Sequence, residues 1–289
     1  MWFMYALLGA FGKSYSGFFR KRIAKSVSSN MYIWVSYTLI LIVFTPFMFS
    51  RFQELKSAVV GLPLVLLGAV LSNLLSTKLN MEALKREELS YTAPLNAMVP
   101  LFTLLIAGVV LSETPPRFGV VGVLAIVLGA YIVSITPDRI HWYDPLKRLV
   151  TSAGAQLSIA VTFFYAINTI FIKLMTNDGH SSLVVFYLTT AIGWLFLLYI
   201  PLLKHRELRA IEKSDKLAVL GGGISSFASG YFHILATAST FTSYATSVRR
   251  LDAIISIFLG WKYLSETNIR IKLVGAAVMT VGTILLAVS

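Results

Sequence analysis

The sequence predicts an all-α integral membrane protein in which ten transmembrane helices form two inverted five-helix repeats. Three observations lead to this prediction. Hydrophobic residues make up 56% of the 289 residues and charged residues only 13%, which is about half the charged share of a soluble domain. Apolar stretches long enough to cross a bilayer recur along the chain. The second half of the chain also repeats the first half at a spacing of 153 residues.

The expected spans are apolar stretches of about 20 residues separated by short polar segments. They lie near residues 2–19, 31–49, 58–80, 90–111, 117–136, 151–173, 182–203, 216–238, 242–264 and 271–288. The N-terminal stretch lacks the basic segment that begins a signal peptide, so we interpret it as the first span. The chain has no cysteine and no P-loop motif, and neither a disulfide framework nor ATP-driven transport is indicated.

The internal repeat is clearest where residues 90–129 align without a gap with residues 243–282. Both segments begin with Ser-Tyr, and the tetrapeptide Leu-Ser-Glu-Thr occurs in each. We expect a first repeat over residues 1–136, a connecting loop over 137–150 and a second repeat over 151–289. Because each repeat holds an odd number of spans, the second enters the membrane from the opposite side. Inverted repeats are typical of secondary transporters, whose substrate site lies near the midplane.

The ten-span layout and the paired Ser-Tyr to Leu-Ser-Glu-Thr segments resemble the drug/metabolite transporter superfamily, specifically its EamA-like family. The resemblance covers essentially the whole chain. It implies a helical bundle that works by alternating access in a cell membrane, without a cofactor. Members of the family move amino acids, sugars, nucleotide-sugars, phosphorylated sugars or drugs, so the resemblance does not specify a substrate.

Lysine and arginine residues are distributed unequally between the two sets of loops. Eighteen follow the odd-numbered spans and four follow the even-numbered spans. Since positive loops stay in the cytoplasm, this asymmetry places both termini outside. Members of the family that this chain resembles commonly have both termini in the cytoplasm, so both orientations remain open.

The ninth span carries Arg249, Arg250 and Asp252, although charged side chains within a span are costly and usually face a bundle interior. Lys13 interrupts the first span. Three cations against one carboxylate favour an anion in a cavity between the repeats, because arginine binds carboxylate and phosphate bidentately. In the alternative interpretation, Arg249 pairs with Asp252 on one helix face, while Arg250 extends to the membrane interface.

The pair Arg249 and Arg250 also resembles the Lys-Arg pair on the ninth span of plastid sugar-phosphate translocators, which are distant members of the same superfamily. That resemblance implies a phosphate-holding role. The fourth span, however, has Asn96 and Ala97 at the repeat-equivalent positions and no second lysine. The sequence therefore favours an anion without specifying a phosphate.

Five further polar side chains are candidates for the lining of the substrate cavity. They are Tyr15, Asn96, Asn168, Tyr231 and His233. A lone histidine or asparagine within a span also commonly serves as a structural hydrogen-bonding group, so both roles stay open for these residues.

The leading hypothesis is a secondary-active or facilitative transporter of a small anionic or zwitterionic metabolite. One alternative is a broad exporter of amphipathic drugs or amino acids, coupled to protons through Asp252. Another is a receptor or scaffold that transports nothing. No metal-ligand spacing or nucleophile motif indicates an enzyme or a bound metal. Basic residues scattered among loops do not indicate nucleic acid, so the expected partners are the substrate, the bilayer and, in a homodimer, a second copy.

Overall fold

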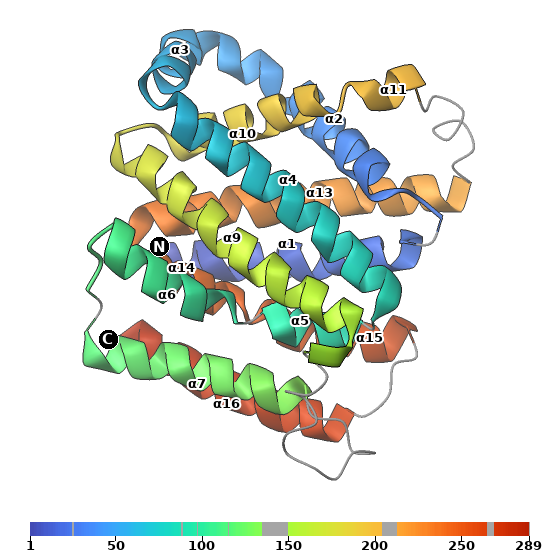
Figure 1. Ribbon diagram of the computed structural model, residues 1–289, viewed down its shortest axis with the longest axis vertical. Coiled ribbons are helices and arrows are strands. Elements are labelled where there is room, and N and C mark those ends of the chain that lie inside the picture. The colour runs from blue at the N-terminus through green and yellow to red at the C-terminus, as the bar shows by residue number, and fades with distance from the viewer. Residues whose placement is uncertain are drawn as a thin grey trace.

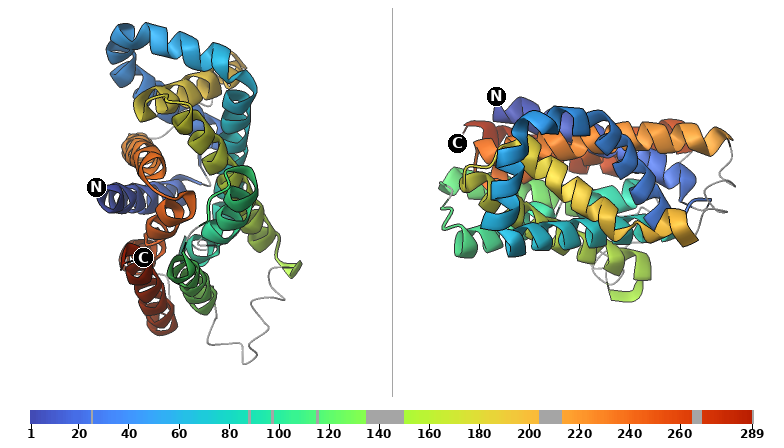
Figure 2. Two further views of the ribbon diagram at one scale, coloured as in Figure 1. Left: turned by 90° about the vertical axis from the view of Figure 1, so that its left-hand side faces the viewer. Right: turned by 90° about the horizontal axis from the view of Figure 1, so that it is seen from above.

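The computed structural model describes residues 1–24, 26–87, 89–96, 98–114, 116–134, 150–203, 213–264 and 269–288. Every regular element in these ranges is a helix, so the predicted all-α class is confirmed. The helices run back and forth between two ends of the molecule, and both termini lie at the same end (Figures 1 and 2).

The helices follow the chain in two comparable series. The first contains α1 (Trp2–Ile23), α2 (Ser29–Met48), η1 (Phe49–Arg51), α3 (Phe52–Gly61), α4 (Pro63–Arg86), α5 (Leu89–Asn96), α6 (Val99–Val110) and α7 (Arg117–Ser134). The second contains α9 (Ala153–Asn177), α10 (Ser182–Phe196), α11 (Tyr199–Leu203), α13 (Lys213–Ser239), α14 (Thr242–Arg249), α15 (Asp252–Leu264) and α16 (Ile269–Val288).

By length and composition alone, four stretches in the described part of the chain are long and apolar enough to cross a membrane. They cover Ser29–Gly61, Pro63–Arg86, Ala153–Asn177 and Ser182–Leu203. The other expected spans are shorter or less apolar for identifiable reasons. Helix α1 carries buried cations, and the spans expected over 90–111 and 242–264 are each interrupted.

The outer surface of the bundle is strongly apolar. Leu64, Val109 and Phe118 are 81%, 85% and 73% exposed, although large apolar side chains gain free energy by leaving water. The interior, in contrast, holds many serine, threonine and charged side chains. An apolar outside and a polar inside fit a chain whose outer solvent is lipid, and the protein is a multi-pass membrane protein.

The expected fourth and ninth spans are each two helices with a break in the middle. The first break separates α5 from α6 after Asn96, and the second separates α14 from α15 at Arg250 and Leu251. The break in the fourth span lies between Pro94 and Pro100, two residues that interrupt helical hydrogen bonding, whereas no proline marks the break in the ninth span. A break frees backbone groups in mid-membrane, which is tolerated only where other protein groups or a cavity satisfy them.

Helix packing exchanges partners between the two series. Helix α1 packs against α13, and α9, its counterpart in the second series, packs against α4. The same side-chain contact occurs in both pairs. A Cβ added at Gly221 would lie 2.6 Å from the Phe19 ring, and one added at Gly68 would lie 2.6 Å from the Phe171 ring. The phenylalanines are 152 residues apart and the glycines 153.

Helices α7 and α16 lie side by side at one edge of the molecule (Figures 1 and 2). A Cβ at Gly129 would lie 2.6 Å from the carbonyl oxygen of Gly275, and a Cβ at Gly282 would lie 2.7 Å from that of Gly122. Each glycine is 153 residues from its counterpart. Only the absence of a side chain permits this approach, as is common where membrane helices pack closely.

One further contact occurs in both series of helices, and a lysine makes it in each. Lys21 donates to the carbonyl oxygens of Leu84 and Glu87 at 2.8 and 2.5 Å, at the end of α4. Lys173 donates to those of Thr237 and Thr240 at 2.9 and 3.0 Å, at the end of α13. A cation on the last carbonyls of a helix is favourable because these groups lack partners within the helix and carry negative partial charge.

Candidate functional site

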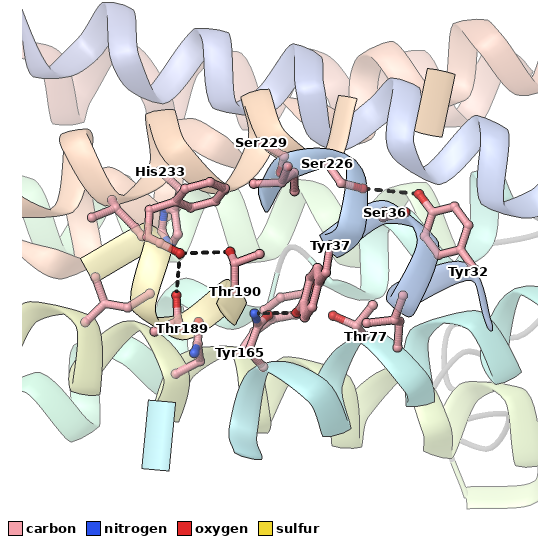
Figure 3. Close-up of a pocket in the computed structure, with 18 of the residues that line it drawn as sticks. Tyr32, Ser36, Tyr37, Thr77, Tyr165, Thr189, Thr190, Ser226, Ser229 and His233 are labelled. Atoms are coloured by element: carbon pink, nitrogen blue, oxygen red, sulfur yellow. Dashed lines mark hydrogen bonds between the residues drawn. The ribbon is translucent and has the colours of Figure 1, made fainter. Parts of the chain in front are cut away.

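A cavity of about 90 Å³ lies inside the bundle, bordered by α1, α2, α4, α9, α10, α13 and α14. This volume has room for several water molecules. Figure 3 shows hydroxyl groups around it, among them those of Ser36, Thr77, Thr189, Thr190 and Ser229. The aromatic rings of Tyr32, Tyr37, Tyr165 and His233 complete much of the wall (Figure 3).

Arg249 is the last residue of α14 and lines this cavity. Its side chain is 5% exposed, and its Nη2 donates to the Oγ of Ser229 at 2.5 Å and to the Ser229 carbonyl oxygen at 3.3 Å. Among the described residues, its Nε has no hydrogen-bond partner. A guanidinium group has five N–H donors, and at least the Nε donor of this buried cation remains available to a ligand.

Arg20 is a second buried cation in the same wall. It donates to the Ser16 Oγ from Nε and Nη2 at 3.1 and 2.7 Å, and to the Asn80 Oδ1 at 3.2 Å. Its guanidinium carbon lies 5.6 Å from the centroid of the Tyr32 ring, within cation–π range. The eighteen basic residues assigned to loops after odd-numbered spans include Arg20, but this assignment is wrong, because Arg20 lies within α1 and is 5% exposed.

No aspartate or glutamate among the described residues lines the cavity that holds Arg20 and Arg249. The carboxylates of four glutamates instead bind the N-terminal ends of other helices. Glu54 accepts a hydrogen bond from Ser181, Glu82 from Ser29, Glu87 from Ser152, and Glu113 from Thr242. Two guanidinium groups in a wall without a described carboxylate create an excess of positive charge, which favours a bound anion.

Arg250 does not line the cavity. It is 1% exposed, and it donates from Nη1 to the Asn96 carbonyl oxygen at 3.1 Å and from Nε to the Thr246 carbonyl oxygen at 3.4 Å. Because successive residues of a helix point about 100° apart, Arg249 and Arg250 face different partners. The expectation that both arginines face one substrate is wrong, since Arg250 joins the break of the ninth span to that of the fourth.

The alternative interpretation of the ninth span is also wrong. The burial of Arg250 excludes extension to the membrane interface. Among the described residues, Asp252 forms no ion pair with Arg249. Asp252 is 3% exposed, and its Oδ1 has no hydrogen-bond partner in the part of the chain that the structure describes. Its backbone carbonyl accepts from the Ser14 Oγ at 2.8 Å, which fixes the start of α15 against α1.

Lys13 is 6% exposed and donates to the Tyr165 hydroxyl at 2.7 Å, with its Nζ 4.0 Å from the ring centroid. These two residues are 152 residues apart, the same spacing that relates Lys21 to Lys173. Tyr165 lines the first cavity, whereas Lys13 lines a smaller neighbouring cavity together with Asn96 and Asp252. Lys13 therefore reaches the first cavity through Tyr165.

The remaining predicted residues divide into two groups. Asn168 and His233 line the first cavity. The Asn168 Nδ2 donates to the Ala69 carbonyl oxygen at 2.8 Å, and the His233 Nε2 lies 3.3 Å from the Thr169 Oγ1. Tyr231 lies instead in an aromatic cluster and borders a separate outer cavity near Arg51. Tyr15 is 44% exposed, and its placement in the lining is wrong because it lies on the opposite face of α1 from Lys13.

Sequence analysis missed Arg20 and Tyr165. A signal for Arg20 is present in the sequence, because Lys13, Ser16 and Arg20 are spaced three and seven residues apart and share one helix face. Tyr165 carries no comparable signal, since tyrosine is common throughout this chain. No cluster of three or more histidine, aspartate or glutamate side chains that could hold a metal occurs within the described ranges.

An all-helical bundle with an apolar exterior belongs to a multi-pass membrane protein, and a buried cavity with cationic walls is typical of a membrane transporter. The EamA-like transporter family model matches residues 1–135 and 152–288. The chain belongs to this EamA-like family, in keeping with the drug/metabolite transporter superfamily.

Two further comparisons concern individual proteins. One solved crystal structure of another protein is similar over 99% of this chain and 98% of its own, with a TM-score of 0.71 at 15% sequence identity. A likeness at this identity shows the fold alone. No curated protein matches the sequence.

Proposed function

We propose that this protein is a non-enzymatic secondary transporter that carries a small organic anion or zwitterion across the cell membrane. One observation carries the proposal: Arg249 is buried in a cavity wall and its Nε has no hydrogen-bond partner among the described residues. A buried charge without a counter-ion is costly, and a substrate carboxylate or phosphate group would supply the missing partner.

The transport mechanism follows from an arrangement of ten spans in two inverted five-helix repeats, over residues 1–136 and 151–289. Two pairs of equivalent contacts and one contact between counterpart helices support it. The α1–α13 contact is matched by α9–α4, α14–α6 by α5–α15, and α7 packs against its own counterpart α16. The two termini at one end also fit an even number of crossings (Figure 1). Two similar halves can exchange conformations, giving alternating access to a site between them.

The residues of the site have separate roles in this proposal. Arg249 binds the anionic group, and Arg20 adds a second positive charge from the opposite series of helices. Asn168, His233 and Tyr165 shape the cavity, with Lys13 positioning the Tyr165 hydroxyl. Arg250 and Asn96 hold the two broken spans together. The monomer contains the whole cavity, so transport does not require a homodimer.

A second candidate function, proton-coupled export of amphipathic cations, rests on the unpartnered Oδ1 of Asp252. The cavity nearest to this carboxylate also contains Lys13, and Arg249 and Arg250 belong to the same span. Three cations repel a cationic substrate more strongly than one carboxylate attracts it. This candidate is therefore the weaker of the two.

Transport in liposomes tests the proposal. The purified protein would be reconstituted and assayed for uptake of organic acids, phosphate esters, amino acids and cationic drugs. Loss of a buried charged partner costs about 2–5 kcal/mol, so Arg249→Gln should lower anion uptake by at least about 30-fold. Arg51→Gln is the matched control, because Arg51 is 45% exposed and pairs with Glu54 outside the cavity.

Unchanged anion uptake by Arg249→Gln would overturn the proposal. Uptake of cationic drugs that Asp252→Asn abolishes would favour the second candidate. If no solute on the panel crosses faster than in protein-free liposomes, the receptor or scaffold hypothesis gains support instead.

A further inference from the structure

The cavity that Arg249 lines holds a second buried guanidinium group, that of Arg20. Within the described ranges, neither group forms an ion pair with a carboxylate. Arg249 donates to Ser229, and Arg20 donates to Ser16 and Asn80. These acceptors are uncharged oxygen atoms, so they leave the charge of each guanidinium group uncompensated. Each group can therefore bind an acidic group of its own.

The buried charges at this cavity and its small neighbour are mostly positive. Four cationic side chains are buried there, those of Lys13, Arg20, Arg249 and Arg250. Asp252 is the one buried carboxylate in the part of the chain that the structure describes. A substrate with one negative charge offsets only one of the three excess positive charges, and a substrate with two offsets two of them. Because burial of an unpaired charge is costly, the cavity favours a dianion.

The two guanidinium groups approach adjacent turns of α13. Arg249 donates to the Ser229 Oγ at 2.5 Å. Arg20 donates to the Ser16 Oγ, which lies 2.8 Å from the Ser226 Oγ. Ser226 and Ser229 are one helical turn apart on α13, and both line the cavity (Figure 3). Successive turns of an α-helix rise about 5.4 Å, and two carboxylates joined by a short aliphatic chain fit a separation of this order.

The rest of the wall suits the aliphatic part of such a molecule. Apolar side chains line it, among them those of Ile40, Ile172, Phe186 and Ile234. No aspartate or glutamate in the described lining can pair with an ammonium group, so a zwitterion would leave its own cation without a partner. The cavity volume of about 90 Å³ is well below the roughly 300–1,000 Å³ of pockets for drug-sized ligands, which favours a compact molecule.

We propose that the substrate is a short dicarboxylate, with one carboxylate bound by Arg249 and the other by Arg20. The inference rests on the proposed function, because it specifies the anion that the cavity transports. Arginine presents parallel N–H donors that match the two oxygen atoms of a carboxylate. Because Arg20 belongs to α1 and Arg249 to α14, the bound dicarboxylate bridges the two series of helices. A substrate with one acidic group contacts only one of them in this way.

The test uses the full-length protein in liposomes at neutral pH, where both carboxyl groups of succinate are ionised. Succinate uptake is compared with that of succinamate, in which an uncharged amide replaces one carboxylate. The panel also includes γ-aminobutyrate, which has an ammonium group at that end, and glycerol phosphate, which carries its negative charge on a single group. Protein-free liposomes supply the background. Since hydrogen bonds to charged groups are strong, kcat/KM for succinate should exceed that for each other solute by at least about tenfold.

Three variants sharpen the test. Arg20→Gln should lower kcat/KM for succinate at least about tenfold more than for succinamate, so that the preference for the dicarboxylate is lost. Arg20→Lys keeps the positive charge and should retain part of the preference. Lys173→Met is the matched control, because Lys173 is a buried cation that binds carbonyl oxygens outside the cavity, and the preference should persist in it. If Arg20→Gln does not fold, the selectivity of the wild-type protein and of Arg20→Lys decides the question.

Equal uptake of succinate and succinamate by the wild-type protein would overturn the dicarboxylate and leave the proposed function intact. Faster uptake of glycerol phosphate or γ-aminobutyrate than of succinate would also overturn it, and would assign a phosphate ester or a zwitterion to the cavity instead. A preference for succinate that survives Arg20→Gln would remove Arg20 from the site. Absence of any Arg249-dependent anion uptake would count against the proposed function itself.

Discussion

The two broken spans differ in charge although they share one architecture. The first breaks after Asn96 and the second after Arg249, and these positions are 153 residues apart. The first break carries only neutral residues in the sequence, whereas the second carries Arg249, Arg250 and Asp252. Because both spans break, the break belongs to the duplicated scaffold and does not depend on the charges. The charges occur in only one of the two spans, and we infer that they serve a ligand.

We expect the largest effect on stability from replacing Arg250. This effect should distinguish Arg250 from Arg249. Replacing Arg250 by methionine removes the hydrogen bond to Asn96 that joins the two breaks and the hydrogen bond to Thr246 within α14. Each buried carbonyl oxygen left without its donor costs about 1–3 kcal/mol. Thermal unfolding in detergent should show a large decrease in Tm for Arg250→Met and little change for Arg249→Gln. Equal decreases for the two variants would mean that both arginines are structural and that the broken spans differ less than we infer.

The glycines at the α7–α16 contact test whether the two halves are equivalent where no charge intervenes. Gly129→Val and Gly282→Val each force a side chain against a backbone carbonyl of the other helix. Overpacking of this kind costs about 1–3 kcal/mol. The two variants should lower the Tm by similar amounts. A large inequality would contradict the symmetric packing of the two helices, and Gly61→Val, where a Cβ meets nothing within 4 Å, is the control.

The lysine contacts at the ends of α4 and α13 should give the smallest effect. Lys21→Met and Lys173→Met each remove an ammonium group from two helix-terminal carbonyl oxygens. Such helix-end contacts contribute about 0.3–2 kcal/mol. We expect small, similar decreases in Tm, measured beside Lys56→Met as a control on the exposed helix α3. A loss confined to one lysine would show that the ends of the two halves are stabilised differently.

The sequence predicted the features that depend on composition and repetition. The helical class follows from the apolar stretches, and the burial of Arg249, Arg250 and Asp252 follows from their position in one of them. The division of roles between the two arginines was not predictable, because it depends on which neighbouring helix each side chain faces. The break in the ninth span was missed for a related reason. Its sequence contains no proline or glycine at residues 249–252, and Asp252 alone, an acidic residue suited to a helix start, marked it.

The hydrogen bond between Lys13 and Tyr165 links two residues at the duplication spacing. The two side chains occupy equivalent positions in the two series of helices, so this bond joins the first helix of one series to the first helix of the other. An ammonium group and a phenol are chemically unlike, so the two series are not interchangeable at the point where they meet.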